Sequence, residues 1–193
     1  EAFQRAIDRG DAATVRLELK AGRGDANRLH RYANSPLSLA ILKGHPKVVA
    51  VLLEFKADVA SEENAAGFPD GWNLRCAARL YSPESEALLM KAKAPAPTAA
   101  CLAEVQFVIA AKKGSERDVR AATLPEGLSL GAATLALHFA VASKKPEVVT
   151  AVIEVSGNPR RPEHAHIRTY QIEDVAMLRA LGNEKAVERL RGR

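Results

Sequence analysis

Residues 35–60 of this 193-residue chain read SPLSLAILKGHPKVVAVLLEFKADVA, and their pattern is the clearest indication of how the chain folds. Two groups of apolar residues at helical spacing predict two short helices, one through Leu37, Leu39, Ala40 and Ile41 and one through Val48, Val49, Leu52 and Leu53. The Gly-His-Pro sequence between them predicts a tight turn. A helix of about three turns is marginally stable alone in water, so this helix pair needs neighbours that bury its apolar faces.

The same stretch resembles an ankyrin repeat, whose usual pattern is TPLHLAAxxGHxxVVxLLLxxGADVN. The residues that match this pattern, or replace it with a close relative, are Ser35, Pro36, Leu37, Leu39, Ala40, Gly44, His45, Val48, Val49, Leu52, Leu53, Ala57, Asp58 and Val59. Two positions depart from it. Ser38 replaces the histidine of the motif, and Lys56 stands where glycine usually adopts a positive φ to end the second helix. The resemblance implies an all-α solenoid of stacked antiparallel helix pairs with protruding loops.

Similar segments recur along the chain, which is the sequence signature of a repeat architecture. We predict a single domain of about six repeats, at residues 1–27, 28–60, 61–97, 98–127, 128–160 and 161–193. The second and fifth repeats follow the pattern best. The fourth is degenerate, with Thr98 as its expected N-cap and a short second helix around Val119. Because each repeat is stabilised by its neighbours, we expect the fourth to be the weakest joint of the stack.

The composition agrees with a helical repeat protein. Apolar residues make up 47% of the chain and charged residues 26%, while aromatic residues are only 5%, which favours closely packed small helices over a β-sandwich core. The sequence has no uncharged apolar run of the roughly 18 residues that a membrane-spanning helix requires. The net charge of +5 favours an acidic partner. Nucleic acid is not predicted, because basic residues alternate with acidic ones and no base-reading motif accompanies them.

The two cysteines, Cys76 and Cys101, lack the spacing of a metal site. We expect two buried apolar thiols. A disulfide remains open, because both residues fall in neighbouring repeats, and it would imply an oxidising compartment. The chain begins at Glu1 rather than Met, which fits either a trimmed chain or a mature protein that has lost a leader. Bacterial periplasm and cytoplasm both remain open as its location.

The resemblance also implies where a partner binds. Ankyrin arrays generally hold another protein on the surface formed by their loops and by the exposed edge of each first helix. The positions at which we expect contact here are Arg31, Tyr32, Asn34, Leu42, Lys43, Phe68, Asp70, Trp72, Arg79, Lys112, Lys113, Lys144, Arg168 and Tyr170. The five cations from Lys43 to Lys144 in this set recur in four consecutive repeats, so they predict a basic stripe that recruits an acidic partner. The alternative is that they are ordinary solvated cations at helix ends, where the helix dipole favours them.

Trp72 and three short motifs need separate interpretations. Trp72, the only tryptophan, is either an exposed anchor for a partner or a plug over the core of the second repeat. The pair His164 and His166 lacks a third metal ligand, so we expect no metal site there. His45 is expected to hydrogen-bond the turn of the repeat. The sequence Arg-Gly-Asp at residues 23–25 is interpreted as a turn rather than as an adhesion motif.

The sequence has no phosphate-binding loop, hydrolase elbow or zinc-protease motif, and we expect no cofactor. We therefore predict a non-enzymatic, protein-binding ankyrin protein. Within that class the chain resembles the bacterial immunity and self-protection proteins that inhibit a toxic enzyme. The first alternative is an adaptor or scaffold domain trimmed from a larger protein, and the second is an enzyme whose site uses no recognised motif.

Overall fold

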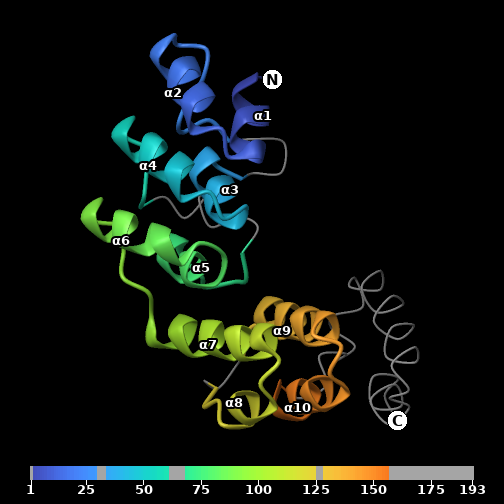
Figure 1. Ribbon diagram of the computed structural model, residues 1–193. Helices are drawn as coiled ribbons and strands as arrows, with labels where there is room; N and C mark the ends of the chain where they lie inside the picture. The colour runs from blue at the N-terminus through green and yellow to red at the C-terminus, as the bar shows by residue number, and fades with distance from the viewer. Residues whose placement is uncertain (1, 30–33, 61–67, 125–127, 157–193) are drawn as a thin grey trace. The chain divides into compact units, whose positions relative to one another are not determined.

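The computed structural model describes residues 2–29, 34–60, 68–124 and 128–156, and every regular element in these ranges is an α-helix (Figure 1). This confirms the predicted all-α class. The helices are α1 (Ala2–Arg9), α2 (Ala12–Lys20), α3 (Pro36–Leu42), α4 (Pro46–Glu54), α5 (Leu74–Tyr81), α6 (Pro83–Lys91), α7 (Ala99–Lys113), α8 (Glu116–Arg120), α9 (Leu130–Ala142) and α10 (Pro146–Ser156). They follow one another as five helix–turn–helix pairs. The predicted sixth repeat lies outside the described residues.

The chain divides into two compact units, Glu1–Cys101 (unit 1) and Leu102–Arg193 (unit 2). In unit 1 the first helices of the pairs pack in the order α1, α3, α5, and the second helices pack in the order α2, α4, α6. Figure 1 shows these two rows on opposite sides of unit 1. In unit 2, α10 packs against both α8 and α9. The prediction of a single domain of six repeats stays a prediction.

Helix starts follow the capping residues of the sequence. The side chains of Asp11, Ser35 and Asn73 each accept a hydrogen bond of 3.0 Å from the backbone N–H three residues later. Thr98 does the same for Cys101 at 3.1 Å, as predicted. Such caps satisfy an N–H that the helix leaves without a partner. The two hydrogen bonds from Thr14 lower the pKa of Asp11. The cap therefore contributes its full stability when the pH is above the pKa of a carboxyl group in the unfolded chain. This contribution is lost as the pH falls through the lowered pKa of Asp11 in the folded protein.

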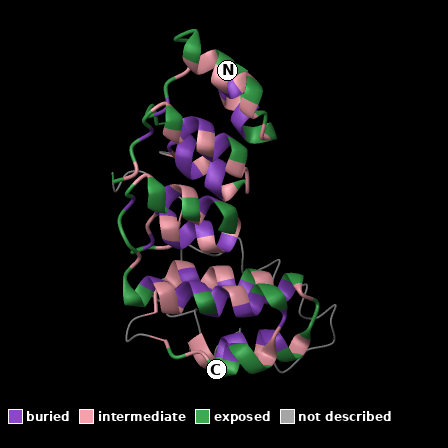
Figure 2. Cartoon of the chain, turned by 60° about the vertical axis from the view of Figure 1, so that its left-hand side comes forward, coloured by how far each residue is buried: buried purple, intermediate pink, exposed green. Residues whose placement is uncertain are grey.

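The predicted apolar faces form the core. In the second repeat Leu37, Ala40 and Ile41 of α3 are fully buried, as are Val48, Val49 and Leu52 of α4, whereas Leu39 and Leu53 are half-buried. Figure 2 shows the buried residues along the helices and exposed residues mainly at their ends and turns. In unit 2 the largest fully buried side chain is Phe107. Each helix pair thus shields its apolar face against its neighbours, as a repeat stack requires.

Several turns and helix ends contain a residue in the left-handed region. Gly44 has φ +72°, and the N–H groups of Gly44 and His45 donate to the carbonyls of Ile41 and Ala40 at 2.9 Å. A side chain at Gly44 would also lie 3.1 Å from the carbonyl oxygen of Tyr81. At three other helix ends a lysine holds such a conformation: φ is +59° at Lys56, +62° at Lys93 and +58° at Lys144.

Replacing Lys56 by glycine is expected to stabilise the protein by about 1 kcal/mol, because glycine adopts a positive φ without the steric cost of a Cβ. Lys56 is exposed, and its backbone makes two hydrogen bonds: the N–H donates to the carbonyl of Leu53 at 3.0 Å, and the carbonyl accepts from the side chain of Asn27 at 3.3 Å. Urea unfolding measures the change. The matched control is Lys47→Gly in α4, which should destabilise by up to about 1 kcal/mol. A loss of stability at both positions would show that the left-handed turn at Lys56 is wrong.

One buried carboxylate fixes the start of α9. Glu104 of α7 is 5% exposed and accepts hydrogen bonds from the backbone N–H of Ser129 at 2.6 Å and from its hydroxyl at 2.9 Å. Ser129 itself caps α9, accepting from the N–H of Ala132. The helix therefore begins at Leu130, five residues before the first apolar residue of the repeat pattern, Leu135.

Replacing Glu104 by alanine is expected to lower the free energy of unfolding by about 1 to 3 kcal/mol, because it removes the acceptor of two partly buried donors. Thermal or urea unfolding measures this loss. Gln106→Ala, two residues along the same helix but exposed, is the control and should change stability by about 0.5 kcal/mol at most. Equal effects of the two substitutions would contradict the buried contact.

Candidate functional site

The predicted contact residues of the second repeat lie around α3. Asn34 precedes the helix cap and is half-buried, and Leu42, the last residue of α3, is half-buried too. Lys43 follows as the C-cap residue and is exposed. The backbone N–H of Lys43 donates to the carbonyl of Leu39 at 3.0 Å. This end of α3 thus offers one apolar and one cationic side chain side by side.

The loop before α5 contains the aromatic and acidic residues of the predicted set. Phe68 stacks on Tyr81 of α5 with ring centroids 6.3 Å apart and an interplanar angle of 29°. Burial raises the pKa of the Tyr81 phenol. Asp70 is exposed in a turn that the N–H of Trp72 closes on the carbonyl of Pro69 at 3.0 Å. Phe68 is half-buried, so the pair exposes only part of its aromatic area.

Trp72 does not reach the surface. Its side chain is 2% exposed, which favours the interpretation as a plug of the core over that as an exposed anchor. Trp72 is therefore not part of the contact surface. An amphipathic side chain such as tryptophan is used both in cores and in interfaces, which is why the sequence left both interpretations open.

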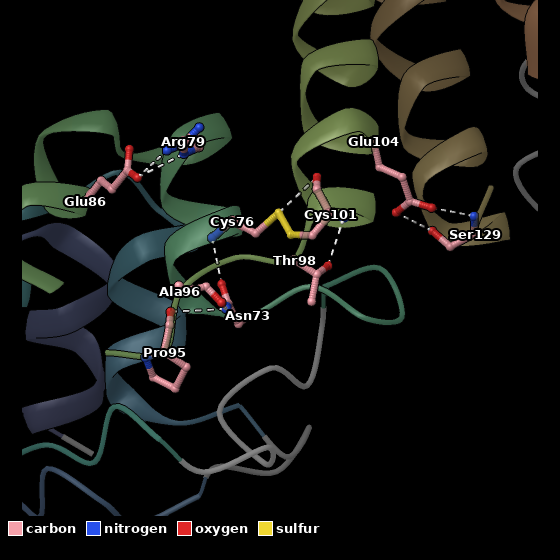
Figure 3. The surroundings of a disulfide bond; sticks show 10 residues. All are labelled: Asn73, Cys76, Arg79, Glu86, Pro95, Ala96, Thr98, Cys101, Glu104 and Ser129. Carbon is pink, nitrogen blue, oxygen red and sulfur yellow. Dashed lines mark hydrogen bonds and ion pairs between the residues drawn. A yellow bond between two sulfur atoms is a disulfide. The ribbon is translucent and has the colours of Figure 1, made fainter. Parts of the chain in front are cut away.

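Arg79 is engaged within the protein, a contact that the sequence analysis missed. Its Nε and Nη2 atoms donate to Glu86 Oε1 of α6 at 2.9 and 2.8 Å (Figure 3). Nη2 of Arg75 lies 3.7 Å from the same oxygen. The Arg79 side chain is 35% exposed. Glu86 thus largely neutralises the charge of Arg79. Arg79 therefore attracts an acidic partner less strongly than an exposed lysine without an ion pair would.

Two of the predicted lysines end α7 in unit 2. Lys112 and Lys113 occupy its last turn, and both are exposed. The Lys112 ammonium lies 5.4 Å from the ring centroid of Phe139 on α9, a cation–π distance. His138 packs edge-on to the same ring, with centroids 5.6 Å apart and planes at 69°. Lys144, in the turn after α9, is also exposed.

Neighbouring turns are tied together by side chains of equivalent position. His45 Nε2 lies 3.2 Å from the carbonyl oxygen of Asp8 near the end of α1. The ring therefore has a structural contact, as expected, but with the preceding repeat rather than with the turn of its own repeat. Lys145 follows His45 by 100 residues in the sequence, and its Nζ donates to the carbonyl oxygen of Gly114 at 2.9 Å. His45 and Lys145 each come directly before a proline, Pro46 or Pro146. This shared position was the sequence signal that could have revealed the contact between Lys145 and Gly114.

The two cysteines are joined. Cys76 of α5 and Cys101 of α7 form a disulfide within unit 1, with their Cα atoms 6.4 Å apart (Figure 3). The expectation of two free thiols was wrong. Helices of neighbouring repeats pack closely enough to bring two such positions within disulfide distance. Both residues are buried, so the bridge is a structural part of unit 1.

The Arg-Gly-Asp sequence at residues 23–25 forms part of the turn after α2, as predicted. Arg23 Nη2 donates to Glu18 at 2.7 Å, and Asp25 Oδ1 accepts from the N–H of Asn27 at 2.8 Å. A Cβ at Gly24 would lie 2.7 Å from the Phe3 ring. The predicted contact residues Arg31, Tyr32, Arg168 and Tyr170, and the histidines at 164 and 166, lie outside the described residues.

The part of the chain that the structure describes contains no group of three His, Cys, Asp or Glu side chains that could hold a metal ion. A search of the same residues for a helix long and apolar enough to cross a membrane found none.

Comparison with known proteins gives one family. A family model described as ankyrin repeat matches residues 32–64, which include the helix pair of residues 35–60. No curated protein matches the sequence. Among the 15 solved chains that match is the ankyrin repeat domain of human ASB11. It is 19% identical with a TM-score of 0.48, and the match covers 83% of this chain and 86% of that one.

Proposed function

Residues 32–64 match an ankyrin repeat, and ankyrin repeats mediate binding between proteins, so we propose that the chain is a non-enzymatic inhibitor of a partner enzyme. In this role it would act as bacterial immunity or self-protection proteins do, by occupying the surface of a toxic enzyme. Ankyrin repeats are typically interaction modules rather than catalysts. The proposal assigns the binding contacts to the ends of the first helices and to the turns that come after them.

The observation that carries the proposal is the exposure of cations at these turns. Lys43, Lys113 and Lys144 are exposed, and none of them forms an ion pair with another described residue. Cations that are not neutralised within their own chain attract an acidic surface and speed its association. Together with the net charge of +5, they support a partner whose contacting surface is acidic.

The disulfide supports an inhibitor outside the cytosol over an intracellular adaptor. Disulfides persist in oxidising compartments such as the bacterial periplasm, and they are rare in cytosolic proteins. A bridge between Cys76 and Cys101 therefore fits a protein that meets its partner in such a compartment. A cytosolic scaffold of the adaptor type would leave this bridge without an explanation.

The test has two stages. The tagged full chain is expressed in its native host, captured with its bound proteins and analysed by quantitative mass spectrometry. Each captured enzyme is then purified, and its activity is measured against increasing amounts of the chain. We expect one enzyme to form a stable complex and to lose activity as the complex forms. A stable complex with full enzyme activity would favour the adaptor, and the absence of any protein partner would overturn the proposed function.

A further inference from the structure

We propose that the partner is held through an acidic segment that docks on a lysine cluster of unit 2, made of Lys112, Lys113, Lys144 and Lys145. This inference rests on the proposed function, and it adds the place of contact and the chemistry of the partner. The four residues come from two successive repeats, at the end of α7 and in the turn after α9.

The two turns that carry the cluster are in direct contact. Lys145 Nζ donates to the carbonyl oxygen of Gly114 at 2.9 Å. A Cβ at Gly114 would lie 3.2 Å from the end of the Lys145 side chain and 3.3 Å from Cβ of Ser143. The turns are thus packed closely, which brings the four lysines to one edge of unit 2.

The cluster is exposed and lacks acidic residues of its own. All four lysines are exposed, and residues 112–114 and 143–145 contain no aspartate or glutamate. The acids that come next in the sequence, Glu116 and Glu147, lie in the first turns of α8 and α10. Glu116 already binds Arg120 at 2.8 Å. Like charges at one edge repel one another, and carboxylates of a partner would relieve this repulsion.

The backbone at Lys144 supports a role beyond structure. Lys144 has φ +58° at the position that glycine holds in three other turns, with φ +73° at Gly10, +72° at Gly44 and +66° at Gly114. Lysine is less stable than glycine in this conformation. A strained residue that is also exposed and charged is a candidate for a functional contact.

The chemistry of the cluster favours a protein segment over a nucleic acid. Single-stranded nucleic acids bind where bases stack on open aromatic faces beside cations. The aromatic ring at this edge, Phe139, is half-buried, and Lys112 lies over its face. The cluster contains lysines and no arginine, so it offers compact point charges rather than planar, bidentate donors to its partner.

The probe is a fluorescein-labelled peptide of twelve glutamates, and its binding to the full chain is measured by fluorescence anisotropy at low and physiological salt. The test variant is Lys113→Glu/Lys144→Glu. It leaves Lys112 on Phe139 and Lys145 on Gly114 in place. The control is Lys47→Glu/Lys91→Glu, which makes the same charge change at exposed positions on α4 and α6. Circular dichroism verifies that both variants are folded.

We expect the test variant to bind the peptide at least about tenfold more weakly than the original chain, and the control to change binding by less than about threefold. Binding should weaken as salt is added. Equal losses in test and control variants would overturn the cluster as the site. Tighter binding of an RNA oligonucleotide or of phosphatidylserine vesicles than of the peptide would overturn the acidic segment as its occupant.

The partner complex separates this inference from the proposed function. If the test variant still binds and inhibits the captured enzyme with unchanged affinity, the lysine cluster is not the contact, while the proposed function stands. If the original chain has no enzyme partner but still binds the peptide at the cluster, the proposed function fails and the acidic-segment site survives.

Discussion

Replacing both Cys76 and Cys101 by alanine is expected to lower the free energy of unfolding by about 3 to 4 kcal/mol. The disulfide closes a loop with a sequence separation of 25 residues, and its loss lets the unfolded chain explore many more conformations. Alanine is chosen because both positions are buried and a serine hydroxyl would add an unsatisfied polar group. Urea unfolding without reductant, monitored by circular dichroism, measures the change.

Reduction of the original chain provides the matched control. Dithiothreitol should destabilise the original chain by a similar amount and should leave the double variant unaffected. If the original chain unfolds at the same urea concentration with and without the reductant, the bridge does not contribute to stability. In that case the disulfide could no longer be taken as evidence that the protein works in an oxidising compartment.

Truncating Phe107 to alanine is expected to destabilise the protein by about 3 to 5 kcal/mol, the usual loss for a buried phenylalanine. Phe107 is 0% exposed and lies on α7, whose partner helix in the repeat, α8, has only five residues. Such a short helix offers few side chains that could fill the cavity. Because repeats are stabilised mainly by their neighbours, we expect hydrogen exchange to accelerate most in α7 to α10.

The conservative change Phe107→Leu tests whether the loss comes from the cavity. It retains most of the apolar volume and should cost about 1 kcal/mol. If the alanine variant loses less than about 1 kcal/mol, Phe107 does not occupy the core of unit 2 as described. Equal destabilisation by leucine and alanine would point to a requirement for the aromatic ring rather than for volume.

The sequence predicted the fold where local patterns suffice. The spacing of Leu37, Ala40 and Ile41 identified the buried side of α3, because a helix brings residues three and four apart to one face. The departure at Lys56 correctly marked a left-handed helix end. Thr98 was recognisable as a cap, since its hydroxyl needs only the local backbone as a partner.

Contacts between side chains of different helices could not be predicted in the same way. The bond from Ser129 to Glu104, the pairing of Arg79 with Glu86 and the disulfide all join residues of different helices. Periodicity shows which side of a helix is apolar, but it does not say which polar side chains meet. For this reason the hydrogen bond between Ser129 and Glu104 was missed, and Arg79 was assigned to a free basic stripe.

The sequence predicted the positions of exposed side chains better than it predicted which side chains are engaged within the protein. Lys43, Lys113 and Lys144 are exposed, which the proposed contact requires, whereas Trp72 is buried. The contribution of Lys145 to the cluster was missed because its position corresponds to the turn histidine, His45, whose role is structural. Contact between the exposed lysines and a partner stays a proposal, and it is open to a direct test.

Lysine footprinting of the purified complex is that test. The chain is treated with an amine-acetylating reagent, alone and with its captured partner, and the acetylation of each lysine is measured by mass spectrometry. We predict that the partner shields Lys43, Lys113 and Lys144, while Lys47 and Lys91 on the second helices of their repeats react as before. Shielding of Lys47 and Lys91 with unchanged reaction at the other three lysines would contradict binding through the turns at the ends of the first helices.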